Sequence, residues 1–391
     1  MSDDFKQQLK AYRQGKLSQE EREELEAELT KLELYQSHLD ELLEEEQPDT
    51  IREAGSVQLN PKRATELMRR GKWRARSWSI GGVIGIVLAA MIVNSILTSI
   101  YYGLGKPEKR NLYADVIESA IAVTSPNMSI SLNSNPSSVL GIKYFGDLVK
   151  QVGDERVYMG DLSTTMLLGW PRLIDQNDNK NSSNHYTPFY LPDESNEGYG
   201  TPGSSKLSSL PEGTVAEVYV SFDRMYSTDE ALKLFEGKNM EPVWLAVYTG
   251  EAGEEGTAAV SHPVGFPTMP MWHEEDGYTT VYGERKVLWW TVGSGSTTSY
   301  PGVETYGSGN VRNENFVNTL RLLSNHKTIT NYYTHFFDAD QALDYVEENG
   351  VAIYGVVVTG PTKELLKLKD APFVRYLHVG EARLWNWDER Q

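Results

Sequence analysis

The chain has 391 residues, which is enough for two or three domains, and it carries a formal net charge of −18 at pH 7. It contains no cysteine, so disulfide scaffolds, thiolate zinc sites and cysteine nucleophiles are excluded. The acidic balance argues against direct binding of nucleic acid, because phosphate-binding surfaces need clustered Lys and Arg. A mean hydropathy of −0.46 excludes a protein with many membrane spans, although a single span remains compatible with it.

Residues 1–76 are predicted to form a small all-α head. A short helix over residues 3–14 ends at Gly15, and a second helix begins at the capping-box pair Ser18 and Glu21. Leucines then recur at spacings of three, four or seven, and glutamates crowd the polar face. The pattern suits a solvated surface around a small bundle core or a coiled-coil dimer. These leucines are Leu25, Leu29, Leu32, Leu39 and Leu43.

Residues 77–105 carry no formal charge and are predicted to form one transmembrane helix. At 1.5 Å per residue, residues 80–100 reach across a hydrocarbon core of about 30 Å. Aromatic side chains flank the segment, as is typical of membrane interfaces. The segment begins too far from the N-terminus for a signal peptide. The flanking aromatic residues are Trp73, Trp78, Tyr101 and Tyr102.

The charges on the two sides of this segment predict its orientation. Seven basic residues precede it and three follow it. The positive-inside rule therefore places the N-terminus in the cytoplasm and the C-terminus outside the cell. The preceding residues are Lys62, Arg63, Arg69, Arg70, Lys72, Arg74 and Arg76, and the following ones are Lys106, Lys109 and Arg110.

Residues 106–210 are predicted to form a juxtamembrane extracytoplasmic region that ends in a linker. Residues 112–123 have the pattern of an amphipathic helix near the membrane. Residues 125–139 and 157–168 have the alternation of strands. Residues 176–209 are rich in Asn, Ser, Gly and Pro, which indicates a long loop or linker between two subdomains.

Residues 211–391 are predicted to form an extracytoplasmic α+β sensor domain with a weak internal repeat. Residues 228–250 and 339–360 each read as a capped helix, a turn and an apolar strand ending in Thr-Gly. Strand-like runs at 215–222 and 329–337 precede them, so we expect two β-α-β units, the alternative being chance similarity. A helix over 364–369 and a strand over 374–385 complete the domain.

The sequence offers little support for enzymatic chemistry. It has no G-x-S-x-G or P-loop motif, and His273-Glu274-Glu275 lacks the second histidine of a zinc protease motif. His273 with Glu274, Glu275 and Asp276 has cation-binding side chains, but a solvated acidic turn explains them better. We therefore expect no catalytic residues, no metal site and no cofactor.

The segment from Tyr12 to Tyr35 resembles the N-terminal domain of bacterial anti-sigma factors. Those domains run Tyr-x-x-Gly-x-Leu-Ser-x-Glu-Glu into a helix with His-x-x-x-Cys-x-x-Cys. In this register the zinc ligands fall on Glu28, Leu32 and Tyr35, so the zinc-binding version is excluded, and apolar packing of Leu32 and Tyr35 would replace the metal. The whole chain is similar to the sigma-factor-regulator family of Gram-positive spore-formers, notably at Trp244 to Gly250.

This resemblance implies an anti-sigma factor that holds an extracytoplasmic-function sigma factor of the sigma M kind at the membrane and releases it on envelope stress. It also suggests a small co-encoded membrane protein as a partner. An acidic amphipathic helix suits a sigma factor, which exposes basic and apolar helical surfaces. The expected partner-binding residues are Leu25, Leu29, Leu32, Tyr35, Leu39, Glu24 and Glu28.

Two other classes of function stay open on the sequence alone. The leucine helix would also suit an envelope structural or division protein that dimerises as a coiled coil, although Gln36 interrupts the pattern. Alternatively, the outer region is a binding module or a hydrolase that the span merely tethers. A sigma-factor reading frame beside the gene would separate these classes.

Overall fold

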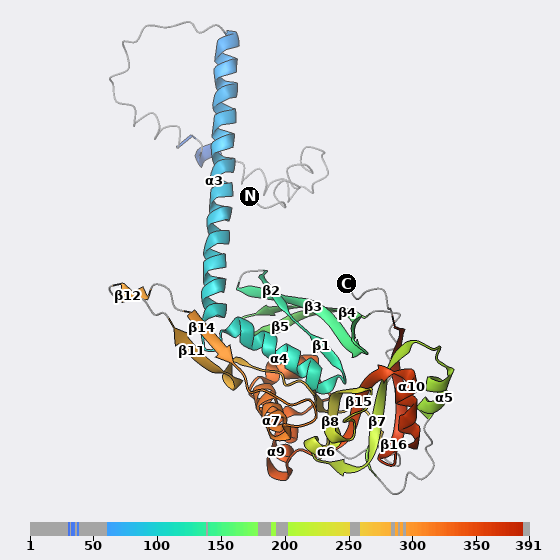
Figure 1. The fold of residues 1–391 in the computed structure, drawn as a ribbon. Helices are drawn as coiled ribbons and strands as arrows, with labels where there is room; N and C mark the ends of the chain where they lie inside the picture. The colour runs from blue at the N-terminus through green and yellow to red at the C-terminus, as the bar shows by residue number, and fades with distance from the viewer. Residues whose placement is uncertain are drawn as a thin grey trace. The chain divides into compact units, whose positions relative to one another are not determined.

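The fold is described from a computed structural model, in two compact units, Met1–Ile84 and Gly85–Gln391 (Figure 1). The few described residues of the head are helical, and an all-α head stays a prediction because the rest lies outside the described residues. The structure describes residues 30–31, 33–35, 37–38, 61–137, 140–178, 189–192, 202–250, 259–282, 286–287, 290–291 and 295–385.

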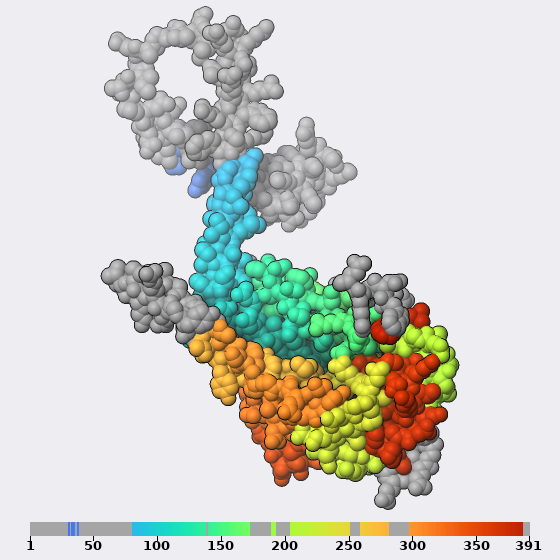
Figure 2. Space-filling model, viewed as in Figure 1, coloured from blue at the N-terminus to red at the C-terminus, as the bar shows by residue number. Residues whose placement is uncertain are grey.

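Helix α3 (Pro61–Gly103) contains the predicted membrane segment. Its residues Ile80–Gly103 form an apolar stretch long enough to cross a membrane, with a mean hydropathy of 2.4. Most of its large apolar side chains are exposed, and Figure 2 shows this stretch uncovered along much of its length. A soluble core helix would instead bury such side chains, so the stretch fits a membrane environment.

After α3 the chain forms helix α4 (Lys109–Thr124), which agrees with the helix predicted at residues 112–123. Six of its residues are buried, so α4 is a core helix of the second unit, Gly85–Gln391. It contacts strands β1 (Met128–Ile130) and β10 (Gly265–Pro267) and helices α7 (Gly309–Asn325) and α8 (Lys327–Tyr333). The apolar face read from the sequence therefore packs against protein.

An antiparallel sheet follows α4, in the order β1-β3-β4-β5, with β2 also paired to β3. The strand predicted at 125–139 forms two short strands, and the one predicted at 157–168 is β4. The two-residue turn between β3 and β4 contains Gly153, whose φ of 65° suits a glycine. The strands are β1 (Met128–Ile130), β2 (Asn133–Pro136), β3 (Gly141–Val152), β4 (Glu155–Leu167) and β5 (Trp170–Asp178).

The second sheet has the order β10-β8-β15-β7-β16 and is antiparallel throughout. Its central strands β15 and β7 are apolar along most of their length and buried on both faces. Helices α5 and α10 contact β16, β7 and β15 (Figure 1). The strands are β7 (Thr214–Tyr226), β8 (Glu241–Val247), β10 (Gly265–Pro267), β15 (Ile353–Pro361) and β16 (Val374–Leu384).

The internal repeat places its two strands side by side in this sheet. The first copy contains α6 (Thr228–Lys233), which Ser227 and Glu230 cap reciprocally, followed by β8. The second contains α9 (Ala339–Asn349), which Asp338 caps, followed by β15. Strands β8 and β15 then pair antiparallel. The predicted order of capped helix, turn and apolar strand thus occurs in both copies.

The strand predicted at 329–337 is wrong, because this segment begins as helix α8 (Lys327–Tyr333). Its β-branched and aromatic residues favour a strand by propensity. In the structure, the Thr330 hydroxyl donates to the carbonyl oxygens of Leu323 and His326, and Ile329 is buried in the core. Tertiary packing therefore overrides local propensity here, and the expectation of two β-α-β units fails in the second copy.

The region read as a linker contains ordered elements among its described residues. These are the end of β5, strand β6 (Phe189–Tyr190) and helix α5 (Pro202–Ser209). Phe189 is fully buried and stacks on Trp244 with ring centroids 6.0 Å apart. An aromatic residue in this polar stretch thus joins the core, which corrects the expectation of a plain linker.

One hydrophobic core draws on both sides of the predicted domain boundary at residues 210 and 211. It joins α4 residues such as Val116 and Ile117 with β7 residues such as Val218 and Val220. Figure 2 shows the two regions lying against each other. Within the described part of the chain, this shared core shows no separation between the two regions, and their division into 106–210 and 211–391 remains a sequence-based prediction.

The remaining described elements are short strands and helices at the ends of these layers. Helix α7 packs against α9, and β11 pairs with β14. The predicted helix at 364–369 is formed by α10 and the 3-10 turn η4. The remaining elements are β9 (Ala259–Val260), η3 (Glu274–Asp276), β11 (Tyr278–Tyr282), β12 (Lys286–Val287), β13 (Trp290–Thr291), β14 (Gly295–Ser299), α7 (Gly309–Asn325), α10 (Thr362–Leu365) and η4 (Leu366–Asp370).

Candidate functional site

A cavity of about 440 Å³ lies in the second unit between α4, strands β1, β3 and β8, and residues 267–273. This volume is in the range of small-molecule sites. One face of α4 forms a wall, because residues spaced three, four and seven apart lie on the same side of a helix. The α4 residues are Asp115, Glu118, Ser119 and Ala122, and apolar lining residues include Met128, Val243, Trp244, Met271 and Trp272.

Trp244 fixes α4 to the second sheet at the base of this cavity. Its side chain is fully buried, and its indole N–H donates to the carbonyl oxygen of Ala122 at 2.8 Å. A buried indole needs such an acceptor. The α4 wall is therefore held in register with β8.

Two carboxyl groups give the α4 wall an acidic character. Burial raises the pKa of Glu118 to about 7, although the backbone N–H of Leu132 donates to its carboxylate at 2.6 Å and partly opposes this shift. Burial also raises the pKa of Asp115, with His273 opposing and Glu274 adding to the shift. Near neutral pH, Glu118 thus exchanges between its charged and neutral forms.

His273 links the α4 wall to the 3-10 turn η3. Its Nε2 lies 2.9 Å from the Ser119 hydroxyl oxygen, and its Nδ1 lies 3.4 Å from a carboxylate oxygen of Asp276. The side-chain amides of Asn315 and Asn318 donate to Asp276 at 3.0 Å. Burial alone would raise the pKa of Asp276, but hydrogen bonds from the side chain and backbone of His273 and from Asn318 lower it below its ordinary value. His273 and Asp276 are therefore partly buried against α4, whereas Glu274 and Glu275 are exposed, as expected for a solvated turn.

The order Ser119, His273, Asp276 matches the hydrogen-bond order of a catalytic triad, but its surroundings oppose acyl transfer. Ser119 lies within α4 on the same face as Asp115 and Glu118. Nearby carboxylates would destabilise the oxyanion that forms when a serine attacks a carbonyl group. The arrangement instead fastens η3 to α4.

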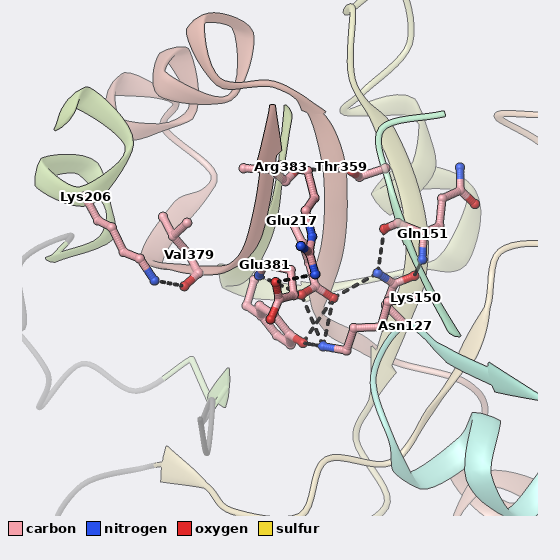
Figure 3. Close-up of polar contacts among 11 residues, drawn as sticks. Asn127, Lys150, Gln151, Lys206, Glu217, Thr359, Val379, Glu381 and Arg383 are labelled. Atoms are coloured by element: carbon pink, nitrogen blue, oxygen red, sulfur yellow. Dashed lines mark hydrogen bonds and ion pairs between the residues drawn. The ribbon is translucent and has the colours of Figure 1, made fainter. Parts of the chain in front are cut away.

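A buried ion pair forms part of the opposite wall and joins the two sheets (Figure 3). The Lys150 ammonium on β3 lies 3.1 Å from the Glu217 carboxylate on β7 and donates to the Tyr219 hydroxyl at 2.7 Å. The Asn127 amide and the backbone N–H of Glu381 also donate to Glu217. Burial would lower the pKa of Lys150, but Glu217 and Tyr219 raise it above its ordinary value.

Because Glu217 neutralises Lys150, the pair leaves the acidic α4 wall largely uncompensated. Two further charged lining residues, Arg156 and Glu241, are exposed. Among the residues that the structure describes, no group of three or more His, Cys, Asp or Glu could hold a metal ion. The cavity thus combines an acidic α4 wall with apolar side chains.

The partner-binding residues expected from the sequence lie almost wholly outside the described residues. Tyr35 is helical and 73% exposed, so its ring is accessible to a partner. The structure tests none of the others, which stay predictions. They are Leu25, Leu29, Leu32, Leu39, Glu24 and Glu28.

Apart from His273, the residues of the cavity and of the adjoining ion pair were not singled out from the sequence, although it held two signals for them. Asp115 and Glu118 interrupt an otherwise apolar helix, and Glu217 interrupts the apolar strand Val215 to Phe222. A charged residue in such a position is either exposed or paired. Its partner, here Lys150 on a distant strand, is set by the tertiary structure.

Comparison with known proteins matches both halves of the chain. Residues 65–157 match the family described as sigma factor regulator N-terminal, and residues 207–381 match sigma factor regulator C-terminal. The probable anti-sigma-M factor YhdL of Bacillus subtilis (strain 168) is 30% identical over 400 residues, covering 99% of this chain and 100% of that protein. No solved structure matches. On this evidence, the chain belongs to the sigma factor regulator family.

Proposed function

We propose that this protein is a membrane-bound anti-sigma factor that sequesters an extracytoplasmic-function sigma factor and releases it on envelope stress. The observation that carries this proposal is the similarity to a probable anti-sigma-M factor over 99% of the chain. A tethered module or a division protein would share only part of such a layout. Membership of a regulator family also points to a protein without enzymatic activity.

The proposed topology is a single pass with the N-terminus in the cytoplasm and the C-terminus outside the cell. The apolar stretch Ile80–Gly103 supports the span, and the basic residues before Ser77 support the orientation. The head, residues 1–76, then faces the compartment in which sigma factors act. A small co-encoded membrane protein is a further proposed partner.

Sequestration requires a head surface that covers the sigma factor's contacts with RNA polymerase. We assign this surface to the leucine face of the second head helix, with acidic neighbours Glu24 and Glu28. Leu32 and Tyr35 occupy the register of zinc ligands in related heads, so binding is expected to need no metal.

The cavity of the outer unit is the proposed sensing site. Helix α4 supplies its acidic wall and begins at Lys109, six residues after α3 ends at Gly103. A ligand that moves α4 would therefore act on the outer end of α3 through a very short connection. A movement transmitted along α3 would then reach the head without contacts from any other element.

Transcription from a sigma-dependent promoter tests the proposed function. Deleting the gene should raise transcription, and the full chain should restore repression. A full-length variant with Leu29→Ala and Leu39→Ala should fail to restore it, whereas Leu384→Ala, a change at an exposed outer residue, should restore it fully.

Copurification of the full chain with the sigma factor in detergent should persist in the presence of a chelator. Loss of the complex on chelation would contradict the metal-free head. Unchanged transcription on deletion would overturn the anti-sigma function and favour a structural role in the envelope.

A further inference from the structure

Two loop tips of the first sheet are fastened to the outer end of α3. The backbone N–H of Leu140 donates to the Asn94 side-chain oxygen at 3.0 Å. The Tyr102 hydroxyl donates to the carbonyl oxygens of Leu140 and Met166, each at 3.3 Å. The backbone N–H of Leu168 in turn donates to the Leu140 carbonyl oxygen. The β2–β3 and β4–β5 tips therefore lie together beside residues 94–102 of the helix.

Burial along this part of α3 agrees with these hydrogen bonds. Thr98 and Tyr102 are each 2% exposed, whereas Ile96, Leu97 and Ile100 are at least half exposed. One face of the helix thus packs against the tips while its other face stays apolar and uncovered. This corrects the sequence-based placement of Tyr102 at the membrane interface, because its ring is enclosed by protein.

Apolar residues occupy tip positions where the backbone disfavours them. Leu140 and Leu168 have φ angles of 53° and 52°, a conformation that glycine and asparagine adopt more readily. Leu168 is nevertheless 41% exposed, and the neighbouring Trp170 is 62% exposed. Strained, exposed leucine beside exposed tryptophan indicates that apolar side chains are needed outside the core.

The length of α3 sets the membrane depth of these tips. The apolar stretch Ile80–Gly103 has 24 residues, or about 36 Å of helix, which exceeds a hydrocarbon core of about 30 Å. Counted from Ser77, the first residue after the basic flank, about 20 residues cross the core and reach the region of Leu97. Asn94 and the β2–β3 tip bound to it then lie at the outer interface, and the β4–β5 tip, which is joined to Leu140 and Tyr102, lies beside them.

We propose that the β4–β5 tip, with Leu168 and Trp170, inserts into the outer lipid interface and seats the extracytoplasmic domain on the membrane. This inference rests on the membrane span of the proposed function. Lipid is the partner because hydrogen bonds hold the tip at the outer end of the apolar stretch, where the exposed Leu168 and Trp170 are close to the membrane surface. Tryptophan at the depth of the lipid headgroups suits the mixed polarity of this layer.

Nitroxide labelling tests the seating, and the chain needs no background substitutions because it has no cysteine. The full chain is reconstituted into nanodiscs of phosphatidylethanolamine and phosphatidylglycerol. Labels are placed at Leu168→Cys, Trp170→Cys and, for reference depth, Val87→Cys within the span. Tyr158→Cys is the matched control. Tyr158 lies on β4, the strand that leads into the tip, and is 42% exposed, close to the exposure of Leu168. It is about 30 Å from Leu168 along the strand.

The ratio of collisions with oxygen to collisions with a water-soluble nickel chelate reports depth. This ratio should be highest at Val87 and lowest at the Tyr158 control. At Leu168 and Trp170 it should be several-fold above the ratio at Tyr158. Ratios at both tip positions equal to the control would overturn the inference. Shielding of both tip labels from oxygen and nickel alike would also overturn it, because a protein would then cover the tip.

The Val87 label separates this inference from the proposed function. A water-like ratio at Val87 would remove the membrane span and with it the proposed topology. A lipid-like ratio at Val87 with water-like ratios at Leu168 and Trp170 would leave the span intact and reject only the seating of the tip.

Discussion

Glu217 and Lys150 are a buried ion pair that ties the first sheet to the second. Their mutual attraction, two further hydrogen-bond donors (the Asn127 amide and the Glu381 backbone N–H) and the Tyr219 hydroxyl compensate for the loss of water around both charges (Figure 3). Removing one partner leaves the other charge buried and unpaired. Substituting one member of the pair therefore tests whether the pair holds the two sheets together.

We expect Glu217→Gln to destabilise the outer unit by about 3 to 5 kcal/mol, the usual cost of breaking a buried pair. The double variant Glu217→Leu with Lys150→Met should recover much of this loss, because apolar residues often replace such pairs without cost. Urea unfolding of the detergent-solubilised protein measures both. A loss under about 1 kcal/mol in the single variant would show that water reaches the pair.

Glu118 gives the outer unit a predicted dependence on pH. Its pKa in the folded protein is about 7, above its ordinary value of 4.5. A raised folded-state pKa gives stability that is fully present below pH 4.5 and is lost as the pH rises through 7. Glu118→Gln should therefore be more stable than the wild-type protein at pH 8, with the difference shrinking toward pH 4.5.

Melting temperatures of the two proteins across this pH range measure the effect. The comparison is made between proteins because other titratable groups face the same cavity. They are Asp115, Lys150, Arg156, Glu241 and His273. If the difference in melting temperature between the two proteins does not vary with pH, any pH dependence of the wild-type stability arises from one of these other groups.

Among the elements, the second head helix carries the prediction for partner binding. Burying one leucine contributes roughly 1.5 to 3 kcal/mol, whereas an exposed charge pair contributes under about 1 kcal/mol. Apolar contacts should therefore set how long the complex lasts, and carboxylates should mainly speed its formation.

Leu29→Ala or Leu39→Ala should accelerate dissociation from the sigma factor, provided circular dichroism shows a head that remains helical. Glu23→Lys with Glu24→Lys should slow association, and this loss should shrink toward about 0.5 M salt, where the Debye length is only a few Å. Surface plasmon resonance separates the two rates. If neither set of changes affects binding, the interface lies outside this helix, and residues 61–73 are the next segment to test.

At the scale of the whole molecule, the proposed topology predicts which part an added protease can reach. In intact, wall-stripped cells, protease should digest the chain after Lys106 and spare the head, because the basic flank holds the N-terminus inside. Immunoblots against tags at the two ends provide the measurement. A protected C-terminal tag would contradict the orientation.

The sequence by itself determined the features that depend on local pattern. The uncharged stretch of residues 77–105 predicted α3, the capped helices before Thr-Gly strands predicted α6 and α9, and the motif from Tyr12 to Tyr35 indicated the family. Such patterns are local because charge, helix capping and hydrophobic period are properties of neighbouring residues.

Only the tertiary structure decided which distant residues meet. It made a helix of the strand-like segment at Ile329, because burial and threonine hydrogen bonds outweighed propensity. It also joined Lys150 to Glu217 and Leu140 to Asn94, across 67 and 46 residues of chain. A sequence shows that a buried charge needs a partner, but the packing of the sheets against each other and against α3 selects which residue that partner is.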